Sequence, residues 1–273
     1  MRGWFSREYE PVETVEPGGS VSFQVPNAGW FWDADVEPER PEGAGHALHG
    51  PVEVHGAREG QTLVVRIDEV VPRDWGRTWA DGETFAWSRD GDWWQLGERR
   101  VRSAPFLGVI GMPPPEPGEH STTPPRRWGG NIDCKELVAG STLYLPIAVD
   151  GALFSTGDGH AAQGDGEVSG TAIECPMERV ELTFALHDDM PLTTPIAQTP
   201  AGWVAMGFDA DLDEATLIAL ETMVDLVAAR EGVRRADALA LCSVAVDLRV
   251  TQIVNQVCGV HAVLAPDALV SSS

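Results

Sequence analysis

Residues 128–174 read WGGNIDCKELVAGSTLYLPIAVDGALFSTGDGHAAQGDGEVSGTAIE, and they place two polar, glycine-rich segments on either side of an apolar one. The polar segments span residues 129–133 and 157–167, and the apolar segment spans residues 143–154. The apolar segment predicts a strand and its return. Because glycines let backbone segments approach closely, the carboxylates, the imidazole and the carboxamides of the polar segments can gather in a small space. We therefore expect a polar pocket built on β-structure.

Segments on both sides of this stretch predict further strands. Residues 20–25 and 179–186 alternate apolar and polar side chains with a period of two, which is typical of a strand with one buried face. Residues 61–70 form a longer apolar run that follows a turn signal. Residues 196–207 carry the pattern of a hairpin.

The character of the chain changes after residue 210. Asp211 or Asp213 is expected to cap a helix that runs to about Arg230, with apolar residues on one face. Residues 235–257 also predict helix, in two pieces at 236–243 and 247–255. The second piece is rich in β-branched residues, which weakens its helical preference.

Strands that come first and helices that come late indicate the α+β class. We expect a predominantly antiparallel β-fold, sandwich-like or barrel-like, with a small C-terminal helical subregion. No linker clearly divides the sequence, so residues 1–273 are expected to form a single domain. If this single domain is divided into sub-lobes, we expect them at residues 1–125 and 126–273.

The composition excludes several kinds of partner. The formal net charge is −23 and would repel nucleic acids and anionic membrane surfaces, whereas a neutral or cationic small substrate is compatible with it. No run of 18 apolar residues predicts a membrane span, and the N-terminus lacks the apolar region of a signal peptide. The four cysteines form no CxxC pair. We expect a cytoplasmic protein with reduced thiols.

Two features outside the central stretch leave alternatives open. Residues 72–96 hold five of the ten tryptophans and show no helical or strand period. They either pack a long loop onto the body of the protein or form an aromatic wall over the pocket. His46 and His49 stand at the end of a loop rich in proline, glycine and acidic residues. They are either hydrogen-bonded loop residues or further metal ligands.

The polar segments carry the chemistry of a hydrolase. One imidazole and two carboxylates can hold a divalent ion with an open position for water, and the ion lowers the pKa of that water. A further carboxylate can then take the proton. Without a metal, a pair of carboxyl groups can work as base and acid, one of them with a raised pKa. A third interpretation is a turn network in which carboxylates cap backbone N–H groups.

Several motifs resemble those of the acetamidase/formamidase family. They are GPV at 50–52, GGNID at 129–133, LYLP at 143–146, GALF at 151–154, GDGHAAQGDGE at 157–167, DLRVTQIVN at 247–255 and GVHAV at 259–263. The resemblance covers most of the chain. It implies a β-rich cytoplasmic homo-oligomer, a dimer or tetramer, that hydrolyses a short-chain or cyclic amide to a carboxylate and ammonia or an amine. The tryptophan-rich residues 72–96 match no pattern of the family, and His49 stands where the family often has threonine.

The predicted site combines the residue chemistry with this resemblance. The expected ligands of a divalent metal, zinc first and calcium as the alternative, are Asp133, Asp158 and His160; the expected catalytic carboxylates are Glu167 and Asp165; the expected substrate contacts are Asn131 and Gln163. Asp158 has the alternative role of orienting the imidazole. A thiol nucleophile at Cys134 is a further alternative. So is a catalytically silent small-molecule-binding protein on the same scaffold.

Overall fold

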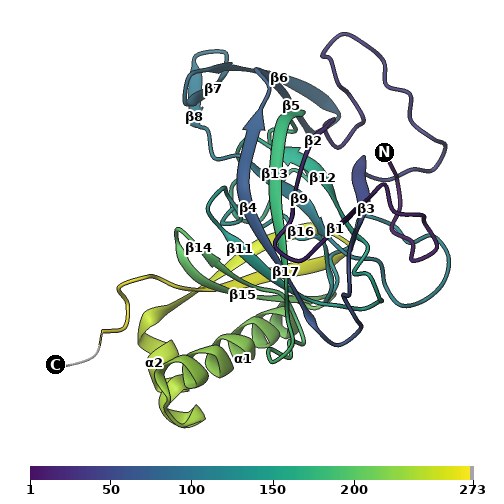
Figure 1. The fold of residues 1–273 in the computed structure, drawn as a ribbon. Coiled ribbons are helices and arrows are strands. Elements are labelled where there is room, and N and C mark those ends of the chain that lie inside the picture. Colours follow the sequence, from purple (N-terminus) through teal and green to yellow (C-terminus); the bar gives the residue numbers. More distant parts are fainter. Residues whose placement is uncertain (271–273) are drawn as a thin grey trace.

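The computed structural model describes residues 1–270 as three β-sheets and two helices (Figure 1). One sheet has five strands in the order β1 (Glu13–Val15), β3 (Leu48–Val54), β12 (Phe154–His160), β9 (Phe106–Gly111) and β10 (Gly129–Asn131). The largest has eight, in the order β16 (Val246–Asn255), β17 (Val257–Leu264), β15 (Gly202–Asp209), β14 (Ile196–Thr199), β11 (Thr142–Pro146), β4 (Thr62–Pro72), β13 (Met177–His187) and β2 (Ser20–Val25). The third has four strands, β5 (Trp75–Ala80), β6 (Glu83–Asp90), β7 (Trp93–Leu96) and β8 (Arg99–Arg102).

The main core lies between the five-stranded and eight-stranded sheets. It contains Leu107 and Phe154 from the first sheet and Leu63 and Phe184 from the second, all at most 1% exposed. The rings of Phe154 and Phe184 meet edge to face, with their centroids 5.1 Å apart. Burying each such side chain contributes about 1.5–3 kcal/mol. Among the strand pairs within residues 1–270 only β1 and β3 run parallel, so the predicted α+β class with predominantly antiparallel strands is confirmed.

Strand β12 is buried along its whole length and lies in the middle of the five-stranded sheet. Its glycines have no room for a side chain. A Cβ on Gly157 would lie 2.1 Å from the backbone oxygen of Ala47, and one on Gly159 would lie 2.4 Å from that of Cys175. These close approaches hold Asp158 and His160 between neighbouring backbone segments.

The predicted first helix is confirmed as α1 (Leu212–Glu231). The side chain of Asp211 caps it by accepting a hydrogen bond from the backbone N–H of Asp213 at 2.8 Å, and Gly232 ends it with a positive φ of 64°. Helix α1 packs on β15 and β17 so closely that a Cβ on Gly207 would lie 2.0 Å from the backbone oxygen of Ala215. Within residues 1–270, no helix has both the length and the apolar composition needed to cross a bilayer.

The prediction of a second helical piece at 247–255 was wrong. After α2 (Arg235–Ala245) the chain enters β16 at once, and β16 pairs with β17 in antiparallel register. β-branched residues such as Val250, Thr251 and Ile253 fit a pleated strand better than a helix. Pairing with β17 therefore decided the conformation of this segment.

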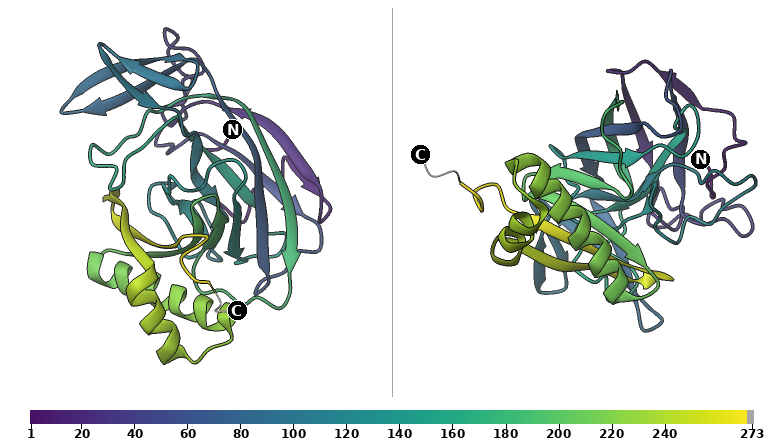
Figure 2. Two further views of the ribbon diagram at one scale, coloured as in Figure 1. Left: turned by 90° about the vertical axis from the view of Figure 1, so that its left-hand side faces the viewer. Right: turned by 90° about the horizontal axis from the view of Figure 1, so that it is seen from below.

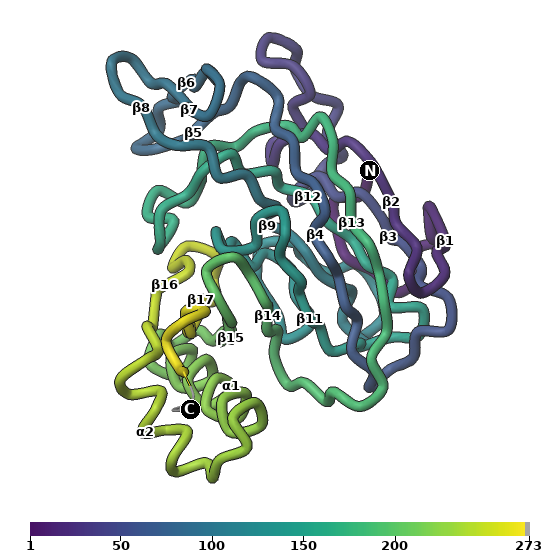
Figure 3. Tube along the Cα trace, turned by 60° about the vertical axis from the view of Figure 1, so that its left-hand side comes forward, coloured from purple at the N-terminus to yellow at the C-terminus, as the bar shows by residue number. Residues whose placement is uncertain are grey.

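The lack of a period in the tryptophan-rich residues 72–96 suggested an irregular loop, and this was wrong. These residues form most of the four-stranded sheet, which lies at the end of the molecule opposite the helices (Figures 2 and 3). Its first turn is Asp81-Gly82, with φ values of 51° and 80°, as two-residue hairpin turns require. Because the sheet stands at the edge of the molecule, most of its residues are partly or fully exposed, which hid the strand period.

Candidate active site

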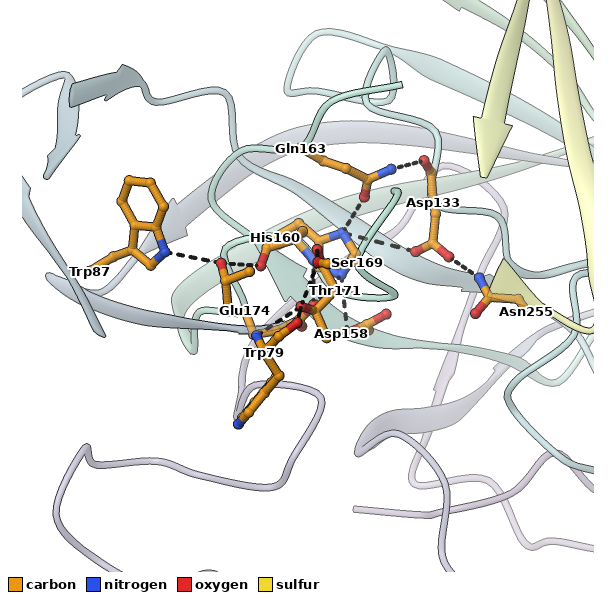
Figure 4. A network of polar contacts seen from close by, with 12 residues as sticks. Trp79, Trp87, Asp133, Asp158, His160, Gln163, Ser169, Thr171, Glu174 and Asn255 are labelled. Atoms are coloured by element: carbon orange, nitrogen blue, oxygen red, sulfur yellow. Dashed lines mark hydrogen bonds and ion pairs between the residues drawn. The ribbon is translucent and has the colours of Figure 1, made fainter. Parts of the chain in front are cut away.

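Five ionisable side chains meet in the interior near the end of β12, and Figure 4 labels four of them, Asp133, Asp158, His160 and Glu174. We call them the buried cluster; they are Asp133, Asp158, His160, Glu167 and Glu174, and each is at most 6% exposed. Asp158 and His160 belong to β12, and Asp133 follows β10. Glu174 pairs through its backbone with His160 on one side and with Arg77 of β5 on the other. The cluster therefore joins the five-stranded sheet to the four-stranded sheet.

The imidazole of His160 lies at the centre of the cluster. Its Nδ1–H donates to Oε1 of Gln163 at 2.9 Å. Its Nε2 lies 3.3 Å from Oδ1 of Asp158 and 3.3 Å from Oε1 of Glu174. With the Nδ1 proton engaged by Gln163, Nε2 of the neutral ring turns its lone pair toward two carboxylates. This arrangement is repulsive unless a proton or a cation stands between them.

Two carboxamides fix the orientation of the cluster. Gln163 donates from Nε2 to the backbone oxygen of Asp133 at 2.8 Å while its Oε1 faces His160. Asn255 of β16 donates from Nδ2 to Oδ2 of Asp133 at 2.5 Å. Both polar ends of Gln163, predicted to contact the substrate, are thus occupied within the cluster. Gln163 orients Asp133 and His160 relative to each other.

Three cluster residues have an unusual backbone conformation. Asp133, Asp158 and Glu167 have φ values of 53°, 59° and 45°, in the left-handed region that non-glycine residues enter rarely. Such conformations cost on the order of 1–3 kcal/mol each and are typical of functional sites. The surrounding sheets hold these three carboxylates in place against that cost.

Gly108 of β9 forms the floor of the cluster. A Cβ at this position would lie 2.5 Å from Oδ2 of Asp158, 2.6 Å from Oδ1 of Asp133 and 2.8 Å from Cε1 of His160. The three predicted metal ligands therefore point toward one small space, and only glycine leaves it open.

Burial and neighbouring charges together set the pKa values of the cluster: burial prevails at Asp133, Glu167 and Glu174, and neighbouring charges prevail at Asp158 and His160. Burial raises the pKa of Glu167 to about 10, with the charge of Asp133 adding to the effect. Burial likewise raises the pKa of Glu174 to about 7 and that of Asp133 to about 6, although the charge of His160 opposes both shifts. Burial alone would lower the pKa of His160, but the Glu174 and Asp158 carboxylates hold it well above its ordinary value. Four carboxyl groups thus face one imidazole, an excess of negative charge that protons or a cation must balance.

The donor set fits a divalent metal. Of the nine buried side-chain atoms without a hydrogen-bond partner among residues 1–270, five belong to the buried cluster: Oδ1 of Asp133, Oδ1 of Asp158, Nε2 of His160, Oε2 of Glu167 and Oε2 of Glu174. Two overlapping groups, Asp133–Asp158–His160 and His160–Glu167–Glu174, each offer three ligand atoms within 4.8 Å of one another. Imidazole nitrogen with carboxylate oxygen suits zinc, and carboxylate oxygen also suits calcium. The structure brings the predicted triad together and adds Glu174.

A cavity of about 590 Å³ leads to the cluster from outside. Gln163 and Glu167 stand at the end of the cavity near the cluster, and Thr78 and Trp87 of the four-stranded sheet line its wall. One tryptophan of residues 72–96 therefore belongs to an aromatic wall, whereas Trp94 is fully buried in the main core. Trp87 thus fits the alternative of an aromatic wall, and Trp94 packs on the body of the protein from a sheet and not from the expected loop.

The other predicted residues lie around the cluster. Asp165 is not part of it, since its carboxylate pairs with Nζ of Lys135 at 2.8 Å on the cavity wall. Asn131 is buried on β10, and its Oδ1 has no hydrogen-bond partner. Cys134 is fully buried, and burial raises the pKa of its thiol to about 12, which disfavours a thiolate nucleophile.

Neither His46 nor His49 belongs to the ligand groups, and His49 lies in strand β3 and not in the expected loop. His49 stacks on Phe23, with ring centroids 4.1 Å apart, so it has a packing role. Nδ1 of His46 lies 2.8 Å from Oγ1 of Thr122. His46 also lines a second cavity, of about 470 Å³.

Sequence analysis did not identify Glu174, Asn255 or Gly108 as site residues. Glu174 ends the central stretch, but no polar neighbour marks it as a partner of His160. Asn255 ends the motif at 247–255, which was assigned to a helix. Its place beside Asp133 depends on β16 being a strand.

Comparison with known proteins agrees with the motifs. The sequence profile of the Acetamidase/Formamidase family matches residues 116–270. A stretch of 48 residues is 50% identical both to the acetamidase of Mycolicibacterium smegmatis and to the formamidase of Methylophilus methylotrophus. This stretch covers 18% of the present chain and 12% of the length of each relative.

The fold agrees with a solved structure over nearly its whole length. The crystal structure of an acetamidase from Bacillus halodurans superposes with a TM-score of 0.87 and 28% sequence identity, over 96% of this chain and 94% of that one. The family profile spans more than half of the chain and includes all five residues of the buried cluster. The chain therefore belongs to the acetamidase/formamidase family, as its motifs predicted.

Proposed function

We propose that this protein hydrolyses the C–N bond of a carboxamide, giving a carboxylate and ammonia or an amine. Family membership supports the reaction class. The observation that carries the proposal is the imidazole of His160, whose Nε2 faces Asp158 and Glu174 at 3.3 Å beside the open floor at Gly108. A site of this kind, reached through a cavity with a carboxyl group at its end, can activate water against an amide.

Asp133, Asp158 and His160 would hold a divalent ion, with Glu174 close by; zinc is our first expectation and calcium the alternative. Their buried atoms without hydrogen-bond partners are the observation that fits such an ion. When bound, the ion supplies polarisation of the amide carbonyl and a lowered pKa for water.

Glu167 is the proposed proton carrier. An amide nitrogen leaves only after it has gained a proton, so the site needs a group that takes a proton from water and returns it to nitrogen. Glu167 lines the cavity beside the cluster, and its raised pKa suits it to give a proton to nitrogen. A bound divalent cation would lower that pKa toward the range in which the carboxylate can first take a proton from water. Gln163 and Asn255 keep His160 and Asp133 in position meanwhile. Asn131, whose Oδ1 has no partner, is proposed to accept a hydrogen bond from the substrate N–H.

The test of this proposal is the release of ammonia and carboxylate from primary amides. Wild-type protein is expected to form both products in equal amounts from formamide or acetamide. His160→Ala is expected to lose this activity while keeping the fold by circular dichroism. If the wild-type protein releases no ammonia from any primary amide and opens no cyclic amide to its amino acid, the alternative of a catalytically silent binding protein replaces this proposal.

We further propose that the protein forms a homo-oligomer in the cytoplasm, as the family resemblance implies. Strand β16 is an edge of the eight-stranded sheet and exposes Leu248 and Ile253, each by about half. Exposed apolar edge strands favour pairing with another chain. Light scattering at micromolar concentration is expected to give a multiple of the 29.4 kDa chain mass, and a mass of one chain would contradict the assembly.

A further inference from the structure

The cavity that leads to the buried cluster is much larger than a short amide needs. Its volume is about 590 Å³, within the range of about 300–1,000 Å³ that is typical of pockets for ligands of drug size. A short amide fills the space of only a few water molecules, at about 30 Å³ each. It would leave most of the cavity to solvent.

The walls of the cavity are predominantly apolar away from Gln163 and Glu167. The apolar lining includes Trp87 and Val101 of the four-stranded sheet together with Val138, Ala162, Val168 and Ile173. Of the charged residues on the wall, Lys135 pairs with Asp165 at 2.8 Å and Glu136 pairs with Arg249 at 2.8 Å, whereas Arg102 lies over the ring of Trp93. A neutral apolar group therefore fits this space better than a charged one.

The tryptophan side of the cavity is held rigidly. Trp87 donates from Nε1 to Oγ1 of Thr78 at 3.0 Å, and that hydroxyl donates to the backbone oxygen of Ala172 at 2.7 Å (Figure 4 shows the indole of Trp87 at the edge of the network). The backbones of Arg77 and Glu174 exchange two hydrogen bonds, of 2.9 and 2.8 Å. These hydrogen bonds connect the wall to the segment that carries Glu174. A rigid wall binds a ligand with little loss of conformational entropy.

We propose that the substrate is a primary carboxamide with an aromatic or branched apolar acyl group. The acyl group lies against Trp87 and Val101, and the carboxamide lies at Glu167. Water adds to the carbonyl carbon, the C–N bond breaks, and the products are the apolar carboxylate and ammonium. This inference rests on the proposed amide hydrolysis and adds the identity of the acyl group.

The test compares kcat/KM for benzamide and isobutyramide with kcat/KM for acetamide in the wild-type protein. Benzamide or isobutyramide is expected to exceed acetamide by at least about tenfold, since each methylene buried in an apolar pocket contributes on that order. Trp87→Ala is expected to lower kcat/KM for benzamide and isobutyramide at least about tenfold more than kcat/KM for acetamide. Trp93→Ala is the matched control, because Trp93 belongs to the same sheet, is 38% exposed and does not line the cavity.

A second variant covers the case in which Trp87→Ala does not fold. Val101 is 37% exposed on the cavity wall, so Val101→Trp is expected to fold and to fill the space of the acyl group. It should lower kcat/KM for benzamide at least about tenfold more than kcat/KM for acetamide. Equal losses for both substrates would overturn the inference.

Failure of this inference is distinguishable from failure of the proposed function. If acetamide is hydrolysed and the bulky amides are not, the acyl-group inference is wrong and amide hydrolysis stands. If no amide is hydrolysed, the proposed amide hydrolysis is wrong. Calorimetric titration with benzamide then shows whether the cavity binds an apolar ligand. Saturable binding that Val101→Trp abolishes supports an apolar ligand site there, and absence of binding overturns it.

Discussion

Glu167→Gln is expected to lower kcat for amide hydrolysis by about 10²–10⁴, the usual contribution of a general acid or base. The substitution preserves the size of the side chain and its ability to form hydrogen bonds. It replaces the carboxyl group, which can take and release a proton, with an amide that cannot. Because Asp133, Asp158 and His160 are unchanged, the protein should still bind zinc, which calorimetry and elemental analysis measure directly.

The control for this variant is Asp165→Asn, since the two carboxylates were equal candidates on sequence grounds. Asp165 pairs with Lys135 at the cavity wall and is not part of the buried cluster, so its loss should cost much less rate. If Glu167→Gln kept a rate near wild type, the proton-carrier role would be wrong. If it lost the metal together with the rate, Glu167 would be a ligand instead.

Gly108→Ala is the second prediction with a large expected effect. The added methyl group would lie 2.5 Å from Oδ2 of Asp158 and 2.6 Å from Oδ1 of Asp133, in the space where their unpaired atoms converge. We expect zinc affinity to fall by at least about 100-fold and amide hydrolysis to fall with it. Overpacking is expected to lower the free energy of unfolding by about 1–3 kcal/mol, so urea unfolding must show that the variant is folded under assay conditions.

Gly164→Ala is the matched control for zinc binding, because a Cβ there meets nothing within 4 Å. Both substitutions add one methyl group at a position without a left-handed backbone. A folded Gly108→Ala variant with wild-type zinc affinity would show that the ion binds elsewhere.

Local sequence signals predicted most of the fold. The period-two alternation identified β2 and β13, and the cap at Asp211 identified the start of α1, because these features depend on neighbouring residues alone. Local signals predicted the wrong secondary structure where pairing with a strand decided the conformation. β16 became a strand because β17 lies beside it, and the exposed hairpins of residues 72–96 lack the apolar alternation that burial produces.

The site was predictable to the extent that its residues are close in sequence. Asp158 and His160 are two positions apart on one strand, so their convergence followed from strand geometry. Glu174 and Asn255 reach the cluster only through pairing with other segments, which no local pattern reveals. Asp165 and Glu167 looked alike in the sequence, and only burial and the ion pair with Lys135 separate them.

The central claim is that the buried cluster binds a divalent ion and that amide hydrolysis depends on it. The most direct measurement is a zinc titration of chelator-stripped wild-type protein in which bound zinc and ammonia release from an amide are followed together. We predict that stripped protein is inactive and that activity rises in proportion to bound zinc until the site is full. Full activity in the stripped protein, with less than a trace of metal by elemental analysis, would contradict the account.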